Sequence, residues 1–317
     1  MSNHNNYQIF IILAIIGCFL IAGCSAPTIP SALKTSTTHP TTPSQTHSPR
    51  QTSTTTATAV PTSTPTSTQP PTASPSPSPS PQKPSATATQ ISQASSGQVE
   101  VPILLYHQIR GESSTNRYEV SIQDFQMQMQ ALQALGFQTI SLSQLLEALA
   151  YGTSLPDNPV MITFDDGHSS VYENAFPIMN KLDFSGILYI VANRINNIPD
   201  FMSISILQEM INAGWEVGSH SYTHADLTFN HSLAYQEIAR SKTDLEKALQ
   251  VEVKSFAYPF GAFDTYVGQK VQQYGYQAGM GLGTSQTHKL NTLFYLSRIE
   301  IYGYTSIDEF KEILSDD

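Results

Sequence analysis

A tract rich in serine, threonine and proline, residues 25–99, most constrains what this chain can fold into. It contains no acidic residue and few large apolar side chains. A segment of this composition buries too little apolar surface to offset the entropy lost on ordering, and its prolines favour an extended backbone. We therefore expect a disordered linker here and one folded domain over residues 100–317.

An uncharged apolar run, residues 9–23, precedes this tract. It is shorter than the ~20 residues of a membrane span and has the length of a signal-peptide core. It closes on Leu-Ile-Ala-Gly-Cys, which resembles the lipobox of bacterial lipoproteins, in which the cysteine, here Cys24, is lipidated. Residues 1–24 are thus predicted to be a lipoprotein-type signal segment, with the domain lipid-anchored on the extracellular face of a bacterial membrane, or secreted. No Lys or Arg precedes the apolar run, so an uncleaved membrane anchor is the alternative.

The remaining composition restricts the chemistry and the partners. Both cysteines, Cys18 and Cys24, lie in the N-terminal segment, which excludes a disulfide or a thiol nucleophile in the domain. The formal net charge is −10, and all 25 acidic residues follow residue 99. An acidic surface disfavours nucleic acid and anionic lipid as partners. No feature of the sequence indicates a protein partner.

Short β-branched runs alternate with helical stretches along the domain. The predicted strands cover residues 103–106, 137–140, 159–164, 186–192, 215–219, 253–259, 276–281 and 293–301, and the predicted helices cover residues 121–136, 141–150, 171–182, 205–214, 231–250, 265–275 and 306–314. This alternation indicates an α/β fold with a parallel sheet. We expect a distorted (β/α) barrel of seven or eight strands, with an open doubly wound sheet as the alternative. No glycine-rich phosphate loop follows any strand, which weakens that alternative.

Local signals support the first predicted helix. Ser121 and Asp124 form an N-terminal capping pair, and Gly136 ends the helix. Its apolar residues recur at helical spacing on one face, namely Phe125, Met129, Leu132 and Leu135. We expect this face to be buried.

The unusual polar residues all follow predicted strands. They are His107 after the first strand, Asp165 and Asp166 after the third, His220 and His224 after the fifth, and Tyr258, Pro259, Phe260 and Gly261 at the end of the sixth. Barrel enzymes carry their catalytic groups on loops at the carboxyl ends of strands. This placement predicts an enzyme.

The paired aspartates and histidines suggest a metal site. His220 and His224 are four residues apart, a spacing that lets two imidazoles bind one ion on a helical turn. One carboxylate would complete three ligands around an open position, as in catalytic zinc sites. We therefore predict one divalent ion, with zinc favoured and cobalt and nickel left open. The same ligands bind Fe(II) in oxygenases, but those enzymes usually have an all-β fold.

The two adjacent aspartates are expected to have different roles. Successive side chains leaving a strand point in different directions, so Asp165 and Asp166 would differ in role, one binding the metal and one acting as a base. A solvated Asp-Gly turn is the alternative for this pair. His168, close behind them, is expected to be an exposed loop residue.

The segments Ile-Thr-Phe-Asp-Asp-Gly, Gly-Ser-His-Ser-Tyr-Thr-His and Phe-Ala-Tyr-Pro-Phe-Gly resemble successive motifs of the polysaccharide deacetylases, carbohydrate esterase family four with a NodB homology domain. The resemblance covers residues 101–314. It implies that Asp165 is the catalytic base and that Asp166, His220 and His224 bind the metal. It also implies that the segment from Tyr258 to Gly261, listed above, contacts substrate and that the Phe260 N–H helps to stabilise the oxyanion.

The sequence departs from this family pattern in three places. Ala257 stands where the third motif has an arginine, the Asp-Trp motif is not visible, and no Leu-x-His motif lies near the C-terminus. Leu105-Tyr106-His107 is a Leu-x-His at the start of the domain instead. First and last strands of a closed barrel are neighbours, so the domain resembles a circularly permuted branch of the family that deacetylates poly-N-acetylglucosamine. His107 would then be the acid, and Arg298 is our candidate for the missing arginine as partner of Asp165.

Together these patterns predict a metal-dependent hydrolase that removes N-acetyl groups from a cell-surface or extracellular polysaccharide. Poly-N-acetylglucosamine, peptidoglycan and chitin-like glycans all remain open as substrates. An O-acetyl esterase acting on xylan-type glycans and an inactive glycan-binding module are the alternatives.

Overall fold

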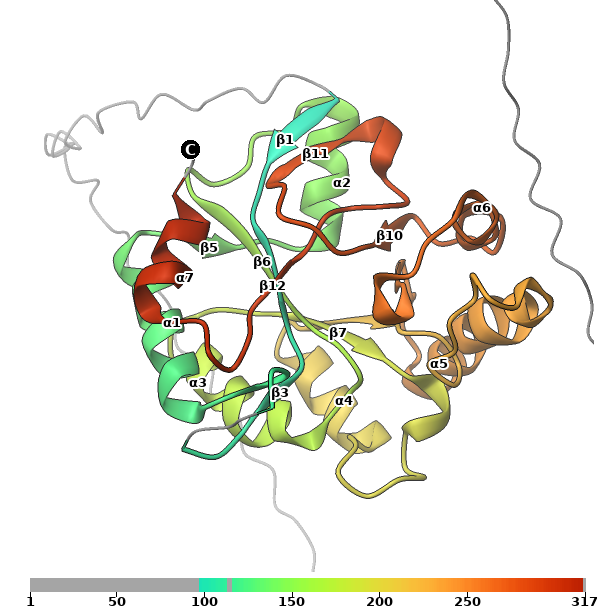
Figure 1. The fold of residues 1–317 in the computed structure, drawn as a ribbon, viewed down its shortest axis with the longest axis horizontal. Helices are drawn as coiled ribbons and strands as arrows, with labels where there is room; N and C mark the ends of the chain where they lie inside the picture. Colours follow the sequence, from blue (N-terminus) through green and yellow to red (C-terminus); the bar gives the residue numbers. More distant parts are fainter. Residues whose placement is uncertain (1–96, 113–115, 316–317) are drawn as a thin grey trace, which may run out of the picture. The chain divides into compact units, whose positions relative to one another are not determined.

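The computed structural model describes residues 97–112 and 116–315 (Figure 1). The predicted signal segment, residues 1–24 with Cys24, and linker residues 25–96 lie outside the described residues, so the interpretations placed on them stay predictions. Within the described ranges, no helix combines the length and the apolar composition needed to span a membrane.

A curled parallel sheet forms the centre of the domain (Figure 1). Its strands in spatial order are β10 (Ala278–Met280), β9 (Ser255–Ala257), β8 (Glu216–Ser219), β7 (Ile187–Ile190), β6 (Pro159–Phe164), β2 (Ile103–Tyr106) and β12 (Ile299–Glu300), and β5 (Gln138–Thr139) pairs with the start of β6. Five consecutive residues of β6 are buried, as expected for a parallel strand that is covered on both faces.

Main-chain hydrogen bonds join the two ends of this sheet. Leu296 pairs in parallel with Met280 of β10, and the Gly281 N–H donates to the Leu296 carbonyl oxygen at 2.8 Å. The same segment continues into β12, where Glu300 lies opposite Leu105 of β2. The predicted distorted barrel is confirmed, and its outermost strands in the sequence, β2 and β12, lie side by side.

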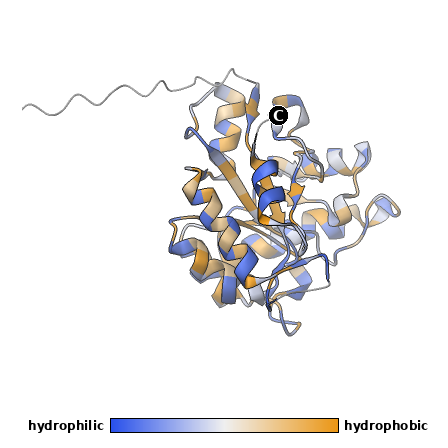
Figure 2. Cartoon of the chain, turned by 60° about the vertical axis from the view of Figure 1, so that its left-hand side comes forward, coloured by the Kyte–Doolittle hydropathy of each residue, from blue (hydrophilic) through white to orange (hydrophobic). Residues whose placement is uncertain are grey.

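Helices cover the outside of the sheet. They are α1 (Ile122–Ala134), α3 (Phe176–Asn180), α4 (Ile204–Asn212), α5 (Ser241–Leu249), α6 (Thr265–Gln273) and α7 (Ile307–Leu314). Figure 2 shows hydrophobic residues concentrated on the central strands and a mixture of polar and apolar residues along the outer helices. The distribution matches one hydrophobic core between the sheet and these helices.

A second hydrophobic cluster fills the inside of the barrel. Alternate strand residues such as Ile103, Met161 and Tyr189 belong to it. Helix α2 (Leu142–Tyr151) adds Leu145 and Leu149, and thereby closes the end of the barrel where the strands begin. The opposite end, where the strands finish, is left for polar side chains.

Helix α1 confirms most of its sequence signals. The Ser121 side chain accepts a hydrogen bond from the Asp124 N–H, and the first three predicted core residues, Phe125, Met129 and Leu132, are fully buried. Leu135 is a wrong prediction: it is the residue at which the helix ends, and it is largely exposed. Gln128 is buried instead, because its amide oxygen accepts a hydrogen bond from the Tyr106 hydroxyl at 2.9 Å.

Two short strand pairs were not predicted. β1 (Gln98–Glu100) runs antiparallel to β11 (Thr287–Lys289), and β3 (Gln108–Ile109) pairs in parallel with β4 (Glu119–Val120). Val99 is buried in the pairing with β11. The last two residues assigned to the linker thus belong to the folded domain, because a partner far along the chain orders them.

Candidate active site

Most of the predicted site residues meet in one cavity at the carboxyl ends of the strands. This cavity has a volume of about 310 Å3, and its lining includes His107, Asp165, Asp166, His220, His224, Tyr258, Phe260, Gly261 and Arg298. The Asp165 N–H donates to the Tyr106 carbonyl oxygen at 2.9 Å, and the His220 N–H donates to the Ile190 carbonyl oxygen at 2.8 Å. These bonds between strand ends bring the loops together, as expected for a barrel enzyme.

Four non-glycine residues around the cavity have left-handed backbone conformations. The φ angle is 71° at Asp166, 68° at Ser221, 71° at His224 and 60° at Phe260. Each such residue costs roughly 1–3 kcal/mol, and strain of this kind gathers at functional sites. Asp165 and Asp166 both line the cavity and have different partners: Asp165 pairs with Arg298, whereas Asp166 lies beside His220 and His224.

The histidine pair follows β8, as predicted, and lies in an irregular turn rather than on a helical turn. Buried Glu237 holds this turn, because its carboxylate accepts hydrogen bonds from the N–H of Tyr222 at 3.1 Å, the N–H of Thr223 at 2.7 Å and the Thr223 hydroxyl at 2.8 Å. The turn still brings the rings of His220 and His224 within 4.8 Å, centroid to centroid. Glu237 lies in a helical stretch of the sequence and carried no signal of this role.

Three of these side chains can hold a metal ion. Asp166, His220 and His224 each offer a ligand atom, and the three atoms lie within 4.8 Å of one another. His220 Nδ1 lies 2.9 Å from the Ala257 carbonyl oxygen, which places the proton on Nδ1 and leaves the Nε2 lone pair for an ion. Burial, together with the nearby His220, lowers the pKa of His224 to about 4, so the His224 ring is neutral, as ligation requires. The donor set fits a divalent ion with open coordination positions.

A bidentate ion pair fixes Asp165. Arg298 donates from Nη1 to Oδ1 at 2.7 Å and from Nη2 to Oδ2 at 2.8 Å. Burial alone would raise the pKa of Asp165, but the guanidinium and His220 hold it at about 2, so the group is a carboxylate. Arg298 is itself buried, with its guanidinium 5.2 Å from the centroid of the Tyr189 ring. The predicted contact between Arg298 and Asp165 is confirmed.

His107 reaches the cavity from the end of β2 with fewer restraints. Its ring lies 4.8 Å from the Tyr118 ring, and its Nδ1 lies 3.9 Å from Glu300 Oε1, beyond hydrogen-bond distance. This nitrogen is buried and has no hydrogen-bond partner among the residues that the structure describes. Burial lowers the pKa of His107, against the attraction of Asp165 and Asp166. Packing against Tyr118, and not a hydrogen bond of Nδ1, therefore positions the ring in the cavity.

The residues of the Tyr258–Gly261 segment differ in what they contribute to the cavity. The Tyr258 hydroxyl donates to the Phe294 carbonyl oxygen at 2.7 Å, and Pro259 is buried and does not line the cavity. The Phe260 ring lies 4.5 Å from the His224 ring and is largely exposed. At Gly261, with φ of 65°, a Cβ would lie 2.5 Å from Leu282 Cγ, so a side chain does not fit. The oxyanion role of the Phe260 N–H stays a prediction.

Sequence reasoning did not identify four residues that shape the cavity. Arg194 donates from Nη1 to Asp166 Oδ1 at 3.0 Å. It follows strand β7, so the search for polar residues after each predicted strand could have found it. Arg117, Tyr118 and Glu300 line the cavity beside His107. The first two lie in a loop without any motif, so only the folded structure reveals them.

His168 differs from its prediction as an exposed loop residue. Its ring stacks on Phe201 at 4.3 Å, and its Nε2 lies 3.9 Å from Asp166 Oδ2. Burial, the largest effect, lowers the pKa of His168. The side chain is largely buried beside Asp166, and its ring packs against Phe201.

Comparisons with known proteins identify related deacetylases. Residues 152–279 match the polysaccharide deacetylase family. The chain is 26% identical over 189 residues to a poly-beta-1,6-N-acetyl-D-glucosamine N-deacetylase of Staphylococcus epidermidis, covering 55% of this chain and 65% of the relative. A crystal structure of a polysaccharide deacetylase from Bacillus cereus matches with a TM-score of 0.61 and 26% identity, covering 69% of this chain and 70% of that one.

A third comparison concerns the fold alone. A Streptococcus pyogenes deacetylase, solved in complex with acetate, has a TM-score of 0.64 at 24% identity, and the match covers 69% of this chain and 99% of that one. The family match includes the segments that carry Asp165, Asp166, His220 and His224. The folded part of this chain is therefore similar to the polysaccharide deacetylases, and the protein is a hydrolase.

Proposed function

We propose that this domain is a metal-dependent N-deacetylase of an extracellular polysaccharide, with poly-β-1,6-N-acetylglucosamine as the favoured substrate. The observation that carries the proposal is the convergence of Asp166, His220 and His224 on one point, beside a fixed carboxylate and within the same cavity as His107. The name of the Staphylococcus epidermidis relative supports the choice of glycan.

Asp166, His220 and His224 would hold the metal. The chemistry that such an ion supplies when bound is Lewis acidity, which polarises a carbonyl group and lowers the pKa of water. Asp165, kept ionised by Arg298, accepts the proton of the attacking water on a carboxylate oxygen. His107 donates a proton to the departing nitrogen, without which an amine leaves poorly. The barrel geometry supports this assignment, because β2 and β12 are neighbours and a Leu-x-His at either end of the sequence would reach the same place.

The test is acetate release by the purified protein after metal analysis. The substrates are β-1,6-linked N-acetylglucosamine oligomers, chitin oligomers, peptidoglycan and O-acetylated xylan. We expect acetate from the β-1,6-linked oligomers in the presence of zinc, cobalt or nickel, and loss of activity with a chelator. Release from acetylated xylan alone would favour the O-acetyl esterase, and no release from any substrate would favour a glycan-binding module.

We further propose that the protein is held at the outer face of the bacterial membrane through a lipid on Cys24. Support comes only from the sequence, namely the short apolar run and the Leu-Ile-Ala-Gly-Cys segment. The experiment compares wild type with Cys24→Ala in cell fractions. Wild type should sediment with membranes. If Cys24→Ala accumulates there as a longer precursor, signal processing depends on the cysteine. Identical electrophoretic mobility of the two proteins would contradict lipidation.

A further inference from the structure

A continuous stack of aromatic and guanidinium groups leads out of the cavity beside His107. The Arg117 guanidinium lies between two rings, 5.0 Å from the centroid of Tyr118 and 4.5 Å from that of Tyr302. Tyr302 in turn stacks on Tyr304 with centroids 5.2 Å apart and an interplanar angle of 23°. We call Arg117, Tyr118, Tyr302 and Tyr304 the aromatic ridge.

Hydrogen bonds hold the ridge in place. Arg117 Nη2 donates to the Tyr302 hydroxyl at 2.7 Å and to Glu300 Oε2 at 3.3 Å. Glu300 belongs to β12, so the middle of the ridge is tied to the barrel rather than to a loop alone. A site built on such a rigid element can orient a ligand.

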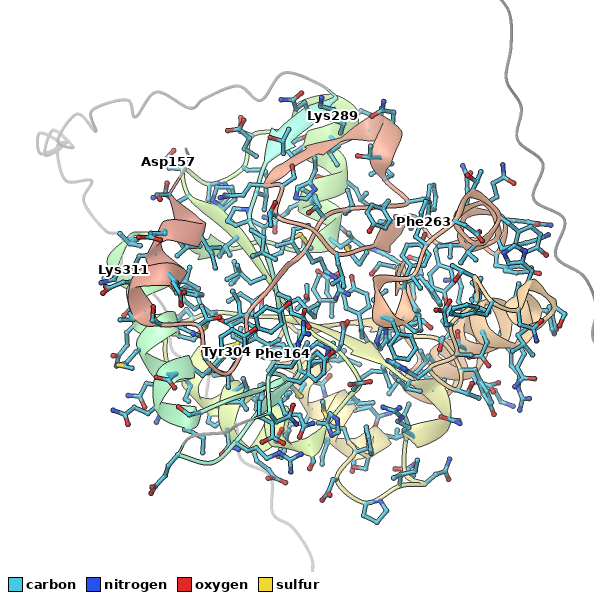
Figure 3. The ribbon with its side chains drawn as sticks, viewed as in Figure 1. Asp157, Phe164, Phe263, Lys289, Tyr304 and Lys311 are labelled. Carbon is cyan, nitrogen blue, oxygen red and sulfur yellow. The ribbon has the colours of Figure 1, made fainter. Side chains whose placement is uncertain are left out.

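The ridge is continuous with the catalytic cavity. Arg117 and Tyr118 line that cavity together with His107, and the Tyr118 ring packs against the His107 ring. At its outer end, Tyr304 lies on the segment between β12 and α7, as Figure 3 shows, and is 69% exposed. Scattered exposed aromatics need no explanation, but a fixed stack that starts at the proposed acid and ends in solvent does.

On the other side of the cavity, Phe260 packs against the metal ligand His224 and is 66% exposed. Exposed aromatic groups therefore flank the reacting position on the side of the metal and on the side of the acid. A ring face that is apolar, with a polar rim, suits the C–H face of a pyranose sugar and its surrounding hydroxyls.

We propose that the aromatic ridge is a binding subsite for a sugar of the same glycan chain, next to the reacting N-acetylglucosamine on the side of His107. This inference rests on the proposed function, because it extends that site along its polymer. It predicts that the enzyme prefers long oligomers, since only a chain that reaches Tyr304 can use the outer end of the ridge.

The experiment compares Tyr304→Ala with wild type on β-1,6-linked N-acetylglucosamine dimers and hexamers. An aromatic contact of ~0.5–1.5 kcal/mol corresponds to a loss of roughly two- to tenfold. We expect kcat/KM for the hexamer to fall by this factor and kcat/KM for the dimer to be unchanged. Tyr304→Trp, which keeps a ring, should restore the hexamer value, and Tyr151→Ala, at an 80% exposed tyrosine that does not line the cavity, is the matched control.

Equal losses for dimer and hexamer, or no loss for either, would overturn the subsite. Direct hexamer binding by calorimetry separates this outcome from failure of the proposed function. If wild type binds the hexamer more tightly than Tyr304→Ala but releases no acetate, the ridge stands and the deacetylase proposal falls. If both proteins release acetate and bind the hexamer equally, the ridge falls and the deacetylase proposal stands.

Discussion

The two walls of the cavity differ in how firmly their catalytic groups are held. One wall, called the firm wall here, carries the proposed metal ligands and the proposed base. On it, both oxygens of Asp165 are bonded to Arg298, and His220 Nδ1 is paired with the Ala257 carbonyl oxygen. The other wall, called the acid wall here, carries the proposed acid, and on it the buried Nδ1 of His107 has no hydrogen-bond partner among the described residues. The groups of the firm wall are thus held by hydrogen bonds before substrate arrives, whereas His107 Nδ1 has no such bond from the described residues.

The largest expected effect is on the metal. His220→Ala removes one of three ligands, so metal affinity should fall by more than about 100-fold, beyond the loss typical of a residue that only orients a ligand. Activity should fall to background, and elemental analysis of the dialysed protein gives the readout. Full metal occupancy in this variant would show that the ion does not sit on the firm wall.

Substitution of the proposed acid distinguishes the two walls most directly, because it should affect turnover but not metal content. His107→Ala should reduce kcat by roughly 10²–10⁴-fold while the metal content stays at the wild-type level. Asp165→Asn should show a similar loss of turnover. If His107→Ala retains wild-type kcat on an N-acetyl substrate, the proton comes from another group and the acid wall has been assigned wrongly.

Substitutions on the two walls should also differ in their effect on the free energy of unfolding. Arg298→Met leaves the Asp165 carboxylate buried and uncompensated, which should cost about 3–5 kcal/mol in the free energy of unfolding. His107→Leu removes a ring whose buried Nδ1 has no hydrogen-bond partner among the described residues, so it should cost less than about 1 kcal/mol. Urea unfolding of the metal-free proteins measures both values, and similar costs for the two variants would contradict the difference in preorganisation.

A smaller effect should appear in the pH dependence of that stability. The pKa of Asp165 is about 2 in the folded protein against 3.8 for the ordinary group, so the ion pair stabilises the fold above about pH 4. This contribution, about 2 kcal/mol, is lost as the pH falls from about 4 to about 2. Urea unfolding of the metal-free wild type and of Arg298→Met across this range gives the comparison. Parallel curves for the two proteins would show that Asp165 does not gain stability from Arg298.

The firm wall was largely predictable from the sequence, because its chemistry is carried by short motifs. Asp165 and Asp166 follow an apolar strand, and His220 and His224 share one loop, so a barrel brings them together. The left-handed turn at Asp166 was not predictable, since an aspartate adopts it only where the surrounding structure compensates for the strain.

The acid wall was less predictable, because it is assembled from distant segments without motifs. His107 was found through a tripeptide, but its neighbours Arg117 and Tyr118 come from a loop, and Glu300 comes from the other end of the domain. Glu237 illustrates the same limit: an acidic residue on a helix is ordinarily solvated, and only the turn that it bonds explains its burial.

The short β1–β11 pair has a consequence for how the enzyme meets a large substrate. The Gly97 N–H donates to the Leu149 carbonyl oxygen of α2, the helix that closes the barrel where its strands begin. The chain thus enters the domain at the pole opposite the catalytic mouth. Gly97 therefore does not stand in the way of a long glycan chain that enters the cavity from the other pole.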